Sequence, residues 1–369
     1  MALTNYWWLL IWLFTGGALI ALCAPKKKEV VCGKVEERWT MSSAFLLVLP
    51  YILWAGFRSD IYGDTYSYRK MFNEAPSSLS QIFSYINEAT KDKGFSALVI
   101  IVKLIVGNSD VLFFLIIATF QLACIVYIYR KYSCNFWFSI FIFVAATDYM
   151  SWMHNGIRQF IAVAIILASS ELIIKKKYIS VVLLVLLAST FHASALLMIP
   201  GIFIIQGKAW NKKTILTLAL ALVAILMIDK FTGILDYLLA ETQYSNMVTD
   251  WQEWQDDGTN PIRVLVYSIP MLLSLIGYRQ IKAVDDNLIN ISVNFSVLAS
   301  GIALISMVTS GIFIGRMVET VYLIPLLILL PWELKNLFTV DSSRLVSLFA
   351  VVGYIAFFYY QMHFAWGLL

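Results

Sequence analysis

The chain of 369 residues is 60% hydrophobic and only 14% charged, with a net charge of +4 and a mean hydropathy of +0.78. Soluble domains average about 45–50% apolar and about 25% charged residues, so this composition excludes a soluble enzyme, a secreted disulfide scaffold, a nucleic-acid-binding module and a disordered chain. The apolar residues form continuous runs between short charged segments, which also excludes a β-barrel with its alternating strands.

We therefore expect an all-α, polytopic integral membrane protein of about 12 transmembrane helices, folded as a single transmembrane domain over residues 1–369. No basic segment precedes the first apolar run, which predicts a retained helix rather than a cleaved signal peptide. Residues 94–106 are too short for a bilayer core of about 30 Å and include Lys103, which predicts a re-entrant or interfacial helix. The predicted spans are 6–23, 41–57, 110–129, 135–148, 157–174, 178–191, 193–206, 213–228, 262–279, 287–309, 317–331 and 344–362.

Lys and Arg residues gather in alternate loops, beginning with Lys26, Lys27 and Lys28 after the first span. The positive-inside rule makes these loops cytoplasmic. Both termini and the outer loops 58–109 and 229–261 then lie on the opposite, extracytoplasmic side of the membrane. Four arginines at the outer ends of helices oppose this charge rule, so we expect a functional reason for them: Arg58, Arg158, Arg263 and Arg316.

A polar segment directly after the second span combines carboxylates, tyrosines and a guanidinium. It begins at Arg58 and contains Asp60, Asp64 and Tyr66. Tyrosines with carboxylates hold sugars through ring stacking and hydroxyl hydrogen bonds, so these residues are candidate sugar contacts. An interfacial aromatic belt with solvated charges is the alternative interpretation.

The junction of the fourth and fifth spans reads His154-Asn155-Gly156-Ile-Arg158-Gln159. Gly156 allows a tight turn, which places Arg158 and Gln159 in the first turn of the next helix. Free N–H groups and the positive end of the helix dipole point outward there, so the junction suits a phosphate. A structural arginine that snorkels from a helix end is the alternative.

A third polar turn, which contains His192 and Ser194, separates the short sixth and seventh spans. A histidine below the membrane surface is costly unless it is paired, which makes His192 a candidate functional residue. A helix-packing histidine bonded to a backbone carbonyl is the alternative.

Two further segments follow toward the C-terminus. Arg316 opens the eleventh predicted span, with Glu319 and Tyr322 at helical spacing on one face. This set is either a structural ion pair or part of a substrate site. The loop 229–261 interleaves acids and aromatics that suit carbohydrate capture, although most of them are expected to be solvated. The outer arginines together predict a doubly charged or pyrophosphate anion, and a nearby carboxylate or histidine could take a proton from a hydroxyl.

These motifs, in this order, resemble the EpsG-like polysaccharide polymerases, which belong with the Wzy O-antigen and capsule polymerases. The resemblance covers about residues 40–330. One departure is Asp92-Lys-Gly94, because an acidic residue usually stands nearer the glycine in that family. The resemblance rests on Arg58…Asp60…Asp64-Thr65-Tyr66, Asp92-Lys-Gly94-Phe95, Asn155-Gly-Ile-Arg158-Gln159 and Phe191-His192-x-Ser194-Ala195.

The resemblance implies a GT-C-like membrane glycosyltransferase on the outer, periplasmic face of the bacterial inner membrane. Such an enzyme joins undecaprenyl-pyrophosphate-linked oligosaccharide repeat units and releases undecaprenyl pyrophosphate. We expect Arg158 and Arg316 to bind the pyrophosphate, with Arg58 or Arg263 assisting. We expect His192 or Asp64 to be the general base, with His192 preferred. The other predicted substrate contacts are Asp60, Tyr66, His154, Asn155, Gln159 and Glu319.

Two rival functions remain open. An O-antigen ligase uses the same lipid-linked donor, and a flippase or other transporter moves such a lipid without chemistry; acyl transfer is a more distant option. The expected partners are the bilayer, the lipid-linked oligosaccharide, a Wzz-like chain-length regulator and a flippase. We expect no nucleic acid, cofactor or metal. The sequence leaves open whether the product is lipopolysaccharide O-antigen, capsule or exopolysaccharide.

Overall fold

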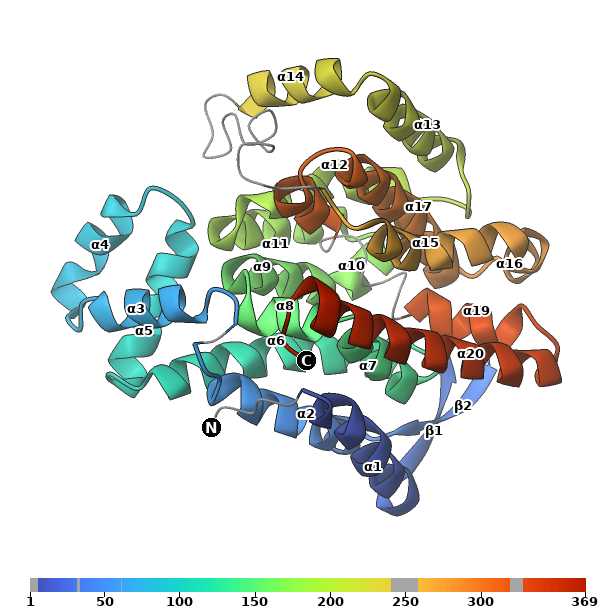
Figure 1. The fold of residues 1–369 in the computed structure, drawn as a ribbon, viewed down its shortest axis with the longest axis horizontal. Helices are drawn as coiled ribbons and strands as arrows, with labels where there is room; N and C mark the ends of the chain where they lie inside the picture. The colour runs from blue at the N-terminus through green and yellow to red at the C-terminus, as the bar shows by residue number, and fades with distance from the viewer. Residues whose placement is uncertain (1–5, 32–33, 61, 240–257, 319–327) are drawn as a thin grey trace. The chain divides into compact units, whose positions relative to one another are not determined.

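The computed structural model describes the chain except residues 1–5, 32–33, 61, 240–257 and 319–327 (Figure 1). Helix makes up 79% of the structure, which confirms the mainly α-helical prediction. The chain forms two compact units. Unit 1 comprises residues 1–172, 177–196 and 339–369, and unit 2 comprises residues 173–176 and 197–338.

Several helices can cross a membrane. Within the described residues, three are long and apolar enough by themselves: Asp110–Tyr132, Asn287–Met307 and Val340–Ala365. Each begins within a few residues of a predicted span. Three more spans arise if helix pairs bent by 68°, 105° and 74° at a short break each count as one. The total of about 12 spans stays a prediction, because the remaining apolar helices are shorter than a bilayer core requires.

The helices of unit 1 begin at polar side chains that the sequence places before its apolar runs. Thr40, Ser109 and Asn135 each accept a hydrogen bond from a backbone N–H in the first turn of the helix that follows. The principal helices are α1 (Trp8–Cys23), α2 (Met41–Gly56), α6 (Asp110–Tyr132), α7 (Phe136–Ala145), α8 (Asp148–His154), α9 (Ile157–Ala168), α11 (Tyr178–Phe191) and α20 (Val340–Tyr359). α2 packs on α6, α6 on α9, and α9 on α11.

A two-stranded antiparallel hairpin interrupts this helical architecture and corrects the purely all-α expectation. β1 (Lys26–Val31) pairs with β2 (Lys34–Trp39), with Lys26 opposite Trp39. Figure 1 shows the hairpin beside α1 and α2. The sequence predicts a basic loop here, because lysine, arginine and glutamate outnumber Val30, Val31 and Val35, the residues that favour a strand.

The predicted outer loop 58–109 contains the helix expected over 94–106 and further helical segments that the sequence does not predict. It contains α3 (Thr65–Glu74), the 3₁₀ turn η1 (Leu79–Gln81), α4 (Ile82–Glu88) and α5 (Lys93–Val106). Its aromatic side chains form a core with α6 and α9, in which Phe72 stacks on Phe113 at 4.6 Å between ring centroids. α5 is the helix predicted over 94–106, and its depth in the membrane stays a prediction.

Two basic side chains hold α3 in place. The Lys103 ammonium is buried and donates to the carbonyls of Phe72 and Asn73 at the C-terminal end of α3, at 2.8 and 2.7 Å. A cation at a helix C-terminus satisfies carbonyls that have no partner within the helix. Arg69 ion-pairs with Asp60 and with Asp110 at the start of α6. Both basic residues therefore have structural contacts.

Unit 2 is organised around α17 (Asn287–Met307), which is buried along most of its length. α17 carries two buried amides, Asn290 and Asn294, which bond backbone groups of the turn at residues 205–210, and Asn290 also donates to Asp285. Asn294 donates to the Ile205 carbonyl at 2.8 Å and accepts from the Trp210 N–H at 3.1 Å. Buried amides thus lock the turn in place. Around α17 lie α12 (Met198–Ile205), α13 (Lys212–Leu226) and α15 (Pro261–Ile276). The unit also contains α14 (Ile228–Leu239), α16 (Tyr278–Val284), the π-helical turn η4 (Gly311–Gly315) and α19 (Leu330–Asn336).

Replacing Lys103 by Met is expected to lower the free energy of unfolding by about 1.5–3 kcal/mol, because it removes two charge-assisted hydrogen bonds to carbonyls at the end of α3. The measurement is thermal unfolding of the purified protein in detergent. Lys91→Met, which removes the same charge from an exposed loop position, is the control and should leave the melting temperature unchanged. Equal melting temperatures for the two variants would contradict the structural role of Lys103.

Candidate functional site

Three helices of unit 1 begin at one place. Asp64 is the N-cap of α3, Asp92 of α5 and Gly156 of α9. The Asp64 carboxylate accepts the Gly156 N–H at 3.2 Å, and the Asp64 N–H donates to the His154 carbonyl at 2.9 Å. These two hydrogen bonds tie the start of α3 to the start of α9. Since N–H groups and positive dipole ends meet here, the place favours negative charge.

Two glycines make this close approach possible. Gly156 has a φ of +71°, which places Arg158 in the first turn of α9 as the sequence predicts. Gly63 has a φ of +66°, and a Cβ atom there would lie 2.3 Å from the His154 carbonyl oxygen. A larger residue at position 63 would therefore separate the two segments.

Arg158 lies at the centre of this convergence. It forms an ion pair with Asp92 at 2.7 Å, and the Tyr68 hydroxyl is within hydrogen-bonding reach of its guanidinium. The Asp92 side chain is only 4% exposed, whereas that of Arg158 is 29% exposed. Burial raises the pKa of the Asp92 carboxyl, and the charge of Arg158 opposes that rise. Arg158 is thus held by the buried Asp92 carboxylate, while part of its side chain remains accessible.

The guanidinium of Arg158 retains hydrogen-bonding capacity. Its Nε is buried and has no acceptor among the described residues. Buried donors are nearly always satisfied, so an unsatisfied one calls for an explanation. The accessible edge of the planar guanidinium, rather than the buried Nε, is the part that suits a phosphate or carboxylate ligand.

The predicted turn at His192 approaches the same place. His192 follows α11 directly, and its Nδ1 lies 2.8 Å from the Ser194 hydroxyl. A Cβ atom on Gly94 would lie 2.2 Å from the Thr190 hydroxyl, so the end of α11 rests against the start of α5. Phe191 packs on the core that contains Phe95 and Tyr68. The His192 turn therefore adjoins the segment that carries Asp92.

Arg58 and Asp60, both predicted substrate contacts, have protein partners. The Arg58 guanidinium is 3% exposed, lies 4.2 Å from the Phe114 ring centroid, and donates to the carbonyls of Ala55 and Met153. It thereby joins the end of α2 to α8. Asp60 pairs with Arg69. These contacts favour structural roles for both residues, and their predicted substrate contacts remain untested.

The remaining predicted contacts of unit 1 differ in exposure. His154 is 3% exposed and packs 4.6 Å from Trp54 between ring centroids, and its Nε2 has no hydrogen-bond partner in the described part of the chain. Gln159 is also buried, beside Gly156. Tyr66 on α3 is 63% exposed. Asn155 is the C-cap of α8.

Two further predicted residues lie in unit 2. Arg263, in the first turn of α15, donates to the Tyr267 hydroxyl at 2.7 Å. The residues before α15 pack against η4, because a Cβ atom on Gly315 would lie 2.5 Å from the Thr259 hydroxyl. Arg316 follows η4 directly, so the structure brings the segments of these two arginines together. Glu319 and Tyr322, and most of the loop 229–261, lie outside the described residues.

Two residues that the sequence does not mark as site residues complete the Arg158 environment: Asp92, which pairs with it, and Tyr68. The signal for Asp92 is its position just before Gly94 and the apolar run of α5, the pattern of a helix N-terminus. Within the described residues, no group of three or more His, Cys, Asp or Glu side chains could hold a metal ion.

Comparison with known proteins agrees with this reading of the motifs. No curated protein and no solved structure matches the chain. A model of the EpsG family matches residues 42–366, nearly the whole chain and further toward the C-terminus than the motifs themselves reach. The matched region includes Asp64, Asp92, Arg158 and His192 in one alignment. The chain therefore belongs to the EpsG family.

Proposed function

We propose that this membrane protein is a polysaccharide polymerase that joins lipid-pyrophosphate-linked oligosaccharide repeat units at the outer face of a bacterial inner membrane. Its membership of the EpsG family and its apolar helices support a role in polysaccharide synthesis within a membrane. The donor must be a lipid-linked sugar, because nucleotide sugars are not available outside the cytoplasm. Undecaprenyl pyrophosphate is then the leaving group.

One observation carries the proposal: Arg158 stands where the N-termini of three helices converge, with a buried carboxylate behind it and an accessible edge in front. Pyrophosphate gains negative charge as its bond to the sugar breaks. A fixed guanidinium and helix dipoles stabilise that charge more in the transition state than in the bound donor. Arg158 is therefore the proposed ligand of the leaving group, with Arg316 and Arg263 as further candidates.

In the proposed reaction, a hydroxyl of the incoming repeat unit attacks the anomeric carbon of the growing chain. The new glycosidic C–O bond forms as the C–O bond to pyrophosphate breaks, and the hydroxyl proton passes to a general base. Asp64 and His192 are the candidate bases, since both adjoin the Arg158 environment. Asp60, Tyr66, His154, Asn155 and Gln159 are proposed to shape the sugar sites.

The deciding experiment is a gel profile of surface polysaccharide from a deletion strain, with and without the wild-type gene. A polymerase deletion leaves single repeat units, and complementation restores the ladder. A full ladder in the deletion strain would overturn the proposal. Complete loss of repeat units from the surface would indicate a flippase or a ligase instead.

Arg158→Ala is expected to reduce polymerisation about 10²–10³-fold, because one charge-stabilising donor is lost from the transition state. Arg158→Lys is expected to recover part of the activity, since an ammonium keeps the charge but not the planar fork. The readout is polymer length per unit time with purified protein and lipid-linked repeat units. Arg344→Ala, at an exposed position, is the matched control and should behave as wild type.

Asp92 is expected to act as a positioning residue through Arg158. Asp92→Ala alone should reduce polymerisation, because it leaves the guanidinium without its buried partner. In an Arg158→Ala background the same change should have little further effect, since contacting residues are not additive. Independent, multiplicative losses in the double variant would contradict this coupling.

The choice of general base can be made by comparing Asp64→Asn with His192→Gln. Loss of the base is expected to cost about 10²–10⁴-fold in turnover, while donor binding persists. We expect His192→Gln to show this pattern, and His363→Ala, at an exposed position, to have wild-type turnover. If Asp64→Asn alone shows it, Asp64 is the base and the preference for His192 is wrong.

A further inference from the structure

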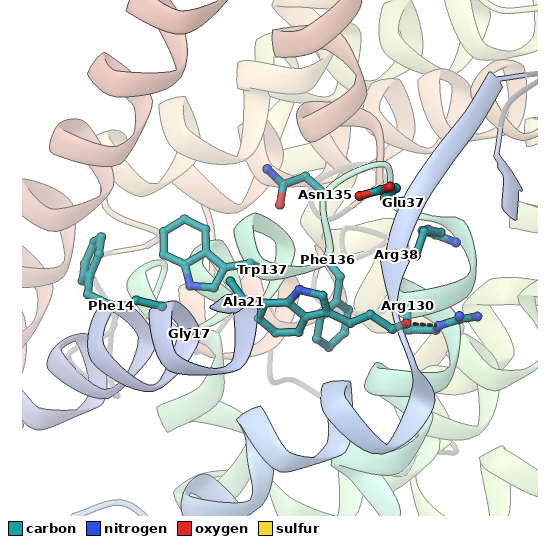
Figure 2. A pocket seen from close by; sticks show the side chains of 11 residues that line it. Phe14, Gly17, Ala21, Glu37, Arg38, Arg130, Asn135, Phe136 and Trp137 are labelled. Atoms are coloured by element: carbon teal, nitrogen blue, oxygen red, sulfur yellow. Dashed lines mark hydrogen bonds between the residues drawn. The ribbon is translucent and has the colours of Figure 1, made fainter. Parts of the chain in front are cut away.

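A cavity of about 390 Å³ lies between α1, β2 and the start of α7 in unit 1, on elements that do not contribute to the Arg158 site (Figure 2). Aromatic rings form much of its wall: Phe14, Trp39, Phe136 and Trp137. Small residues of α1 complete the lining: Gly17, on which Trp137 rests, and Ala18 and Ala21. Such a space, apolar and bounded by aromatics, suits a hydrocarbon chain.

The aromatic wall is fixed rather than loosely packed. A Cβ atom on Gly17 would lie 2.4 Å from the Trp137 indole nitrogen, so the indole rests directly on the α1 backbone. That nitrogen donates to the Leu13 carbonyl at 2.8 Å, and the Trp137 ring stacks on Phe141 at 5.5 Å between centroids. The cavity is therefore a built feature of the fold.

Its position relative to α1 places the cavity at a membrane interface. α1 exposes large apolar side chains along its length, with Ile11 58%, Leu19 61% and Leu22 84% exposed. The helix ends at Cys23, and the basic strand β1 begins at Lys26. An apolar exposed helix that gives way to lysines marks the boundary between acyl chains and headgroups.

The hairpin register places opposite charges at this boundary. Lys26 pairs with Trp39 and Lys28 with Glu37. Paired residues of an antiparallel ladder project to the same face, so both lysines share a face with two residues that line the cavity. Lys27 pairs with Arg38, a third residue that lines the cavity, and both project to the other face.

The two arginines beside the cavity already have partners. Arg130 donates to the Trp39 carbonyl at 2.8 Å and to Glu29 at 2.7 Å. Arg38 donates to the carbonyls of Lys131 and Ser133. They hold the hairpin against the end of α6, which leaves the exposed Lys26, Lys28 and Glu37 to meet a ligand.

From this arrangement we infer that the cavity binds a phospholipid whose headgroup carries both a phosphate and a primary ammonium. One acyl chain lies against the aromatic wall, the phosphate contacts Lys26 and Lys28, and the ammonium contacts Glu37. A purely anionic headgroup would leave Glu37 facing a like charge, whereas this headgroup gives both signs a partner. The site is independent of the proposed polymerase reaction.

The test is native mass spectrometry of the full chain in detergent, titrated with dioleoyl phosphatidylethanolamine, phosphatidylglycerol or phosphatidylcholine. The wild type is expected to bind phosphatidylethanolamine about fivefold more tightly than phosphatidylglycerol, the affinity ratio that one exposed ion pair produces. Glu37→Gln should abolish that preference. Lys26→Gln with Lys28→Gln should weaken binding of both lipids about 30-fold. Lys27→Gln, which removes the same charge from the other face, is the matched control.

A second pair of variants tests the acyl-chain part of the cavity. Ala18→Trp fills the space beside α1 and should abolish binding, whereas Leu19→Trp, on an adjacent exposed position, should not. Equal binding of the three lipids by the wild type overturns the inference. So does an unchanged preference in Glu37→Gln, or equal binding by the Ala18→Trp and Leu19→Trp variants.

Discussion

The ion pair between Arg158 and Asp92 is the interaction on which the organisation of unit 1 depends most clearly. It joins the first turn of α9 to the N-cap of α5, and the Asp64 carboxylate joins the same turn of α9 to α3. A buried carboxylate in an apolar protein requires a partner, because an uncompensated buried charge costs several kcal/mol. The pair therefore fixes the starts of α5 and α9, the Asp64 bond adds the start of α3, and one edge of the guanidinium stays accessible.

The basic side chains of this protein are of two kinds, which differ in what their hydrogen-bond donors contact. Lys103 and Arg58 are buried and donate their hydrogen bonds to backbone carbonyls. Lys103 thereby caps the C-terminal end of α3, and Arg58 joins α2 to α8. Arg158 has a carboxylate partner, an accessible edge and an unused donor. In an apolar chain this difference is more informative than the mere presence of a positive charge.

The hairpin illustrates the same contrast at the other predicted face of the membrane. Arg38 and Arg130 anchor it through carbonyls and Glu29, while Lys26 and Lys28 stay exposed beside the cavity. The anchored residues give the strand a fixed register, and that register decides which lysines stand next to Glu37. Lipid selectivity at this cavity would thus follow from strand pairing rather than from the number of basic residues.

The sequence alone determined that the chain is helical and apolar, that Gly156 opens a turn, and that Arg158 begins the next helix. These features depend on local periodicity, on the conformational freedom of glycine and on helix-end chemistry, all of which act over a few residues. The order of motifs was also sufficient to identify the EpsG family. Only the tertiary structure decided that Asp92 is the partner of Arg158 across 66 positions of chain, that Arg58 is enclosed by carbonyls, that the loop 58–109 folds into helices, and that the basic loop forms a hairpin. Each of these depends on contacts between distant segments, whose register and pairing no local pattern specifies.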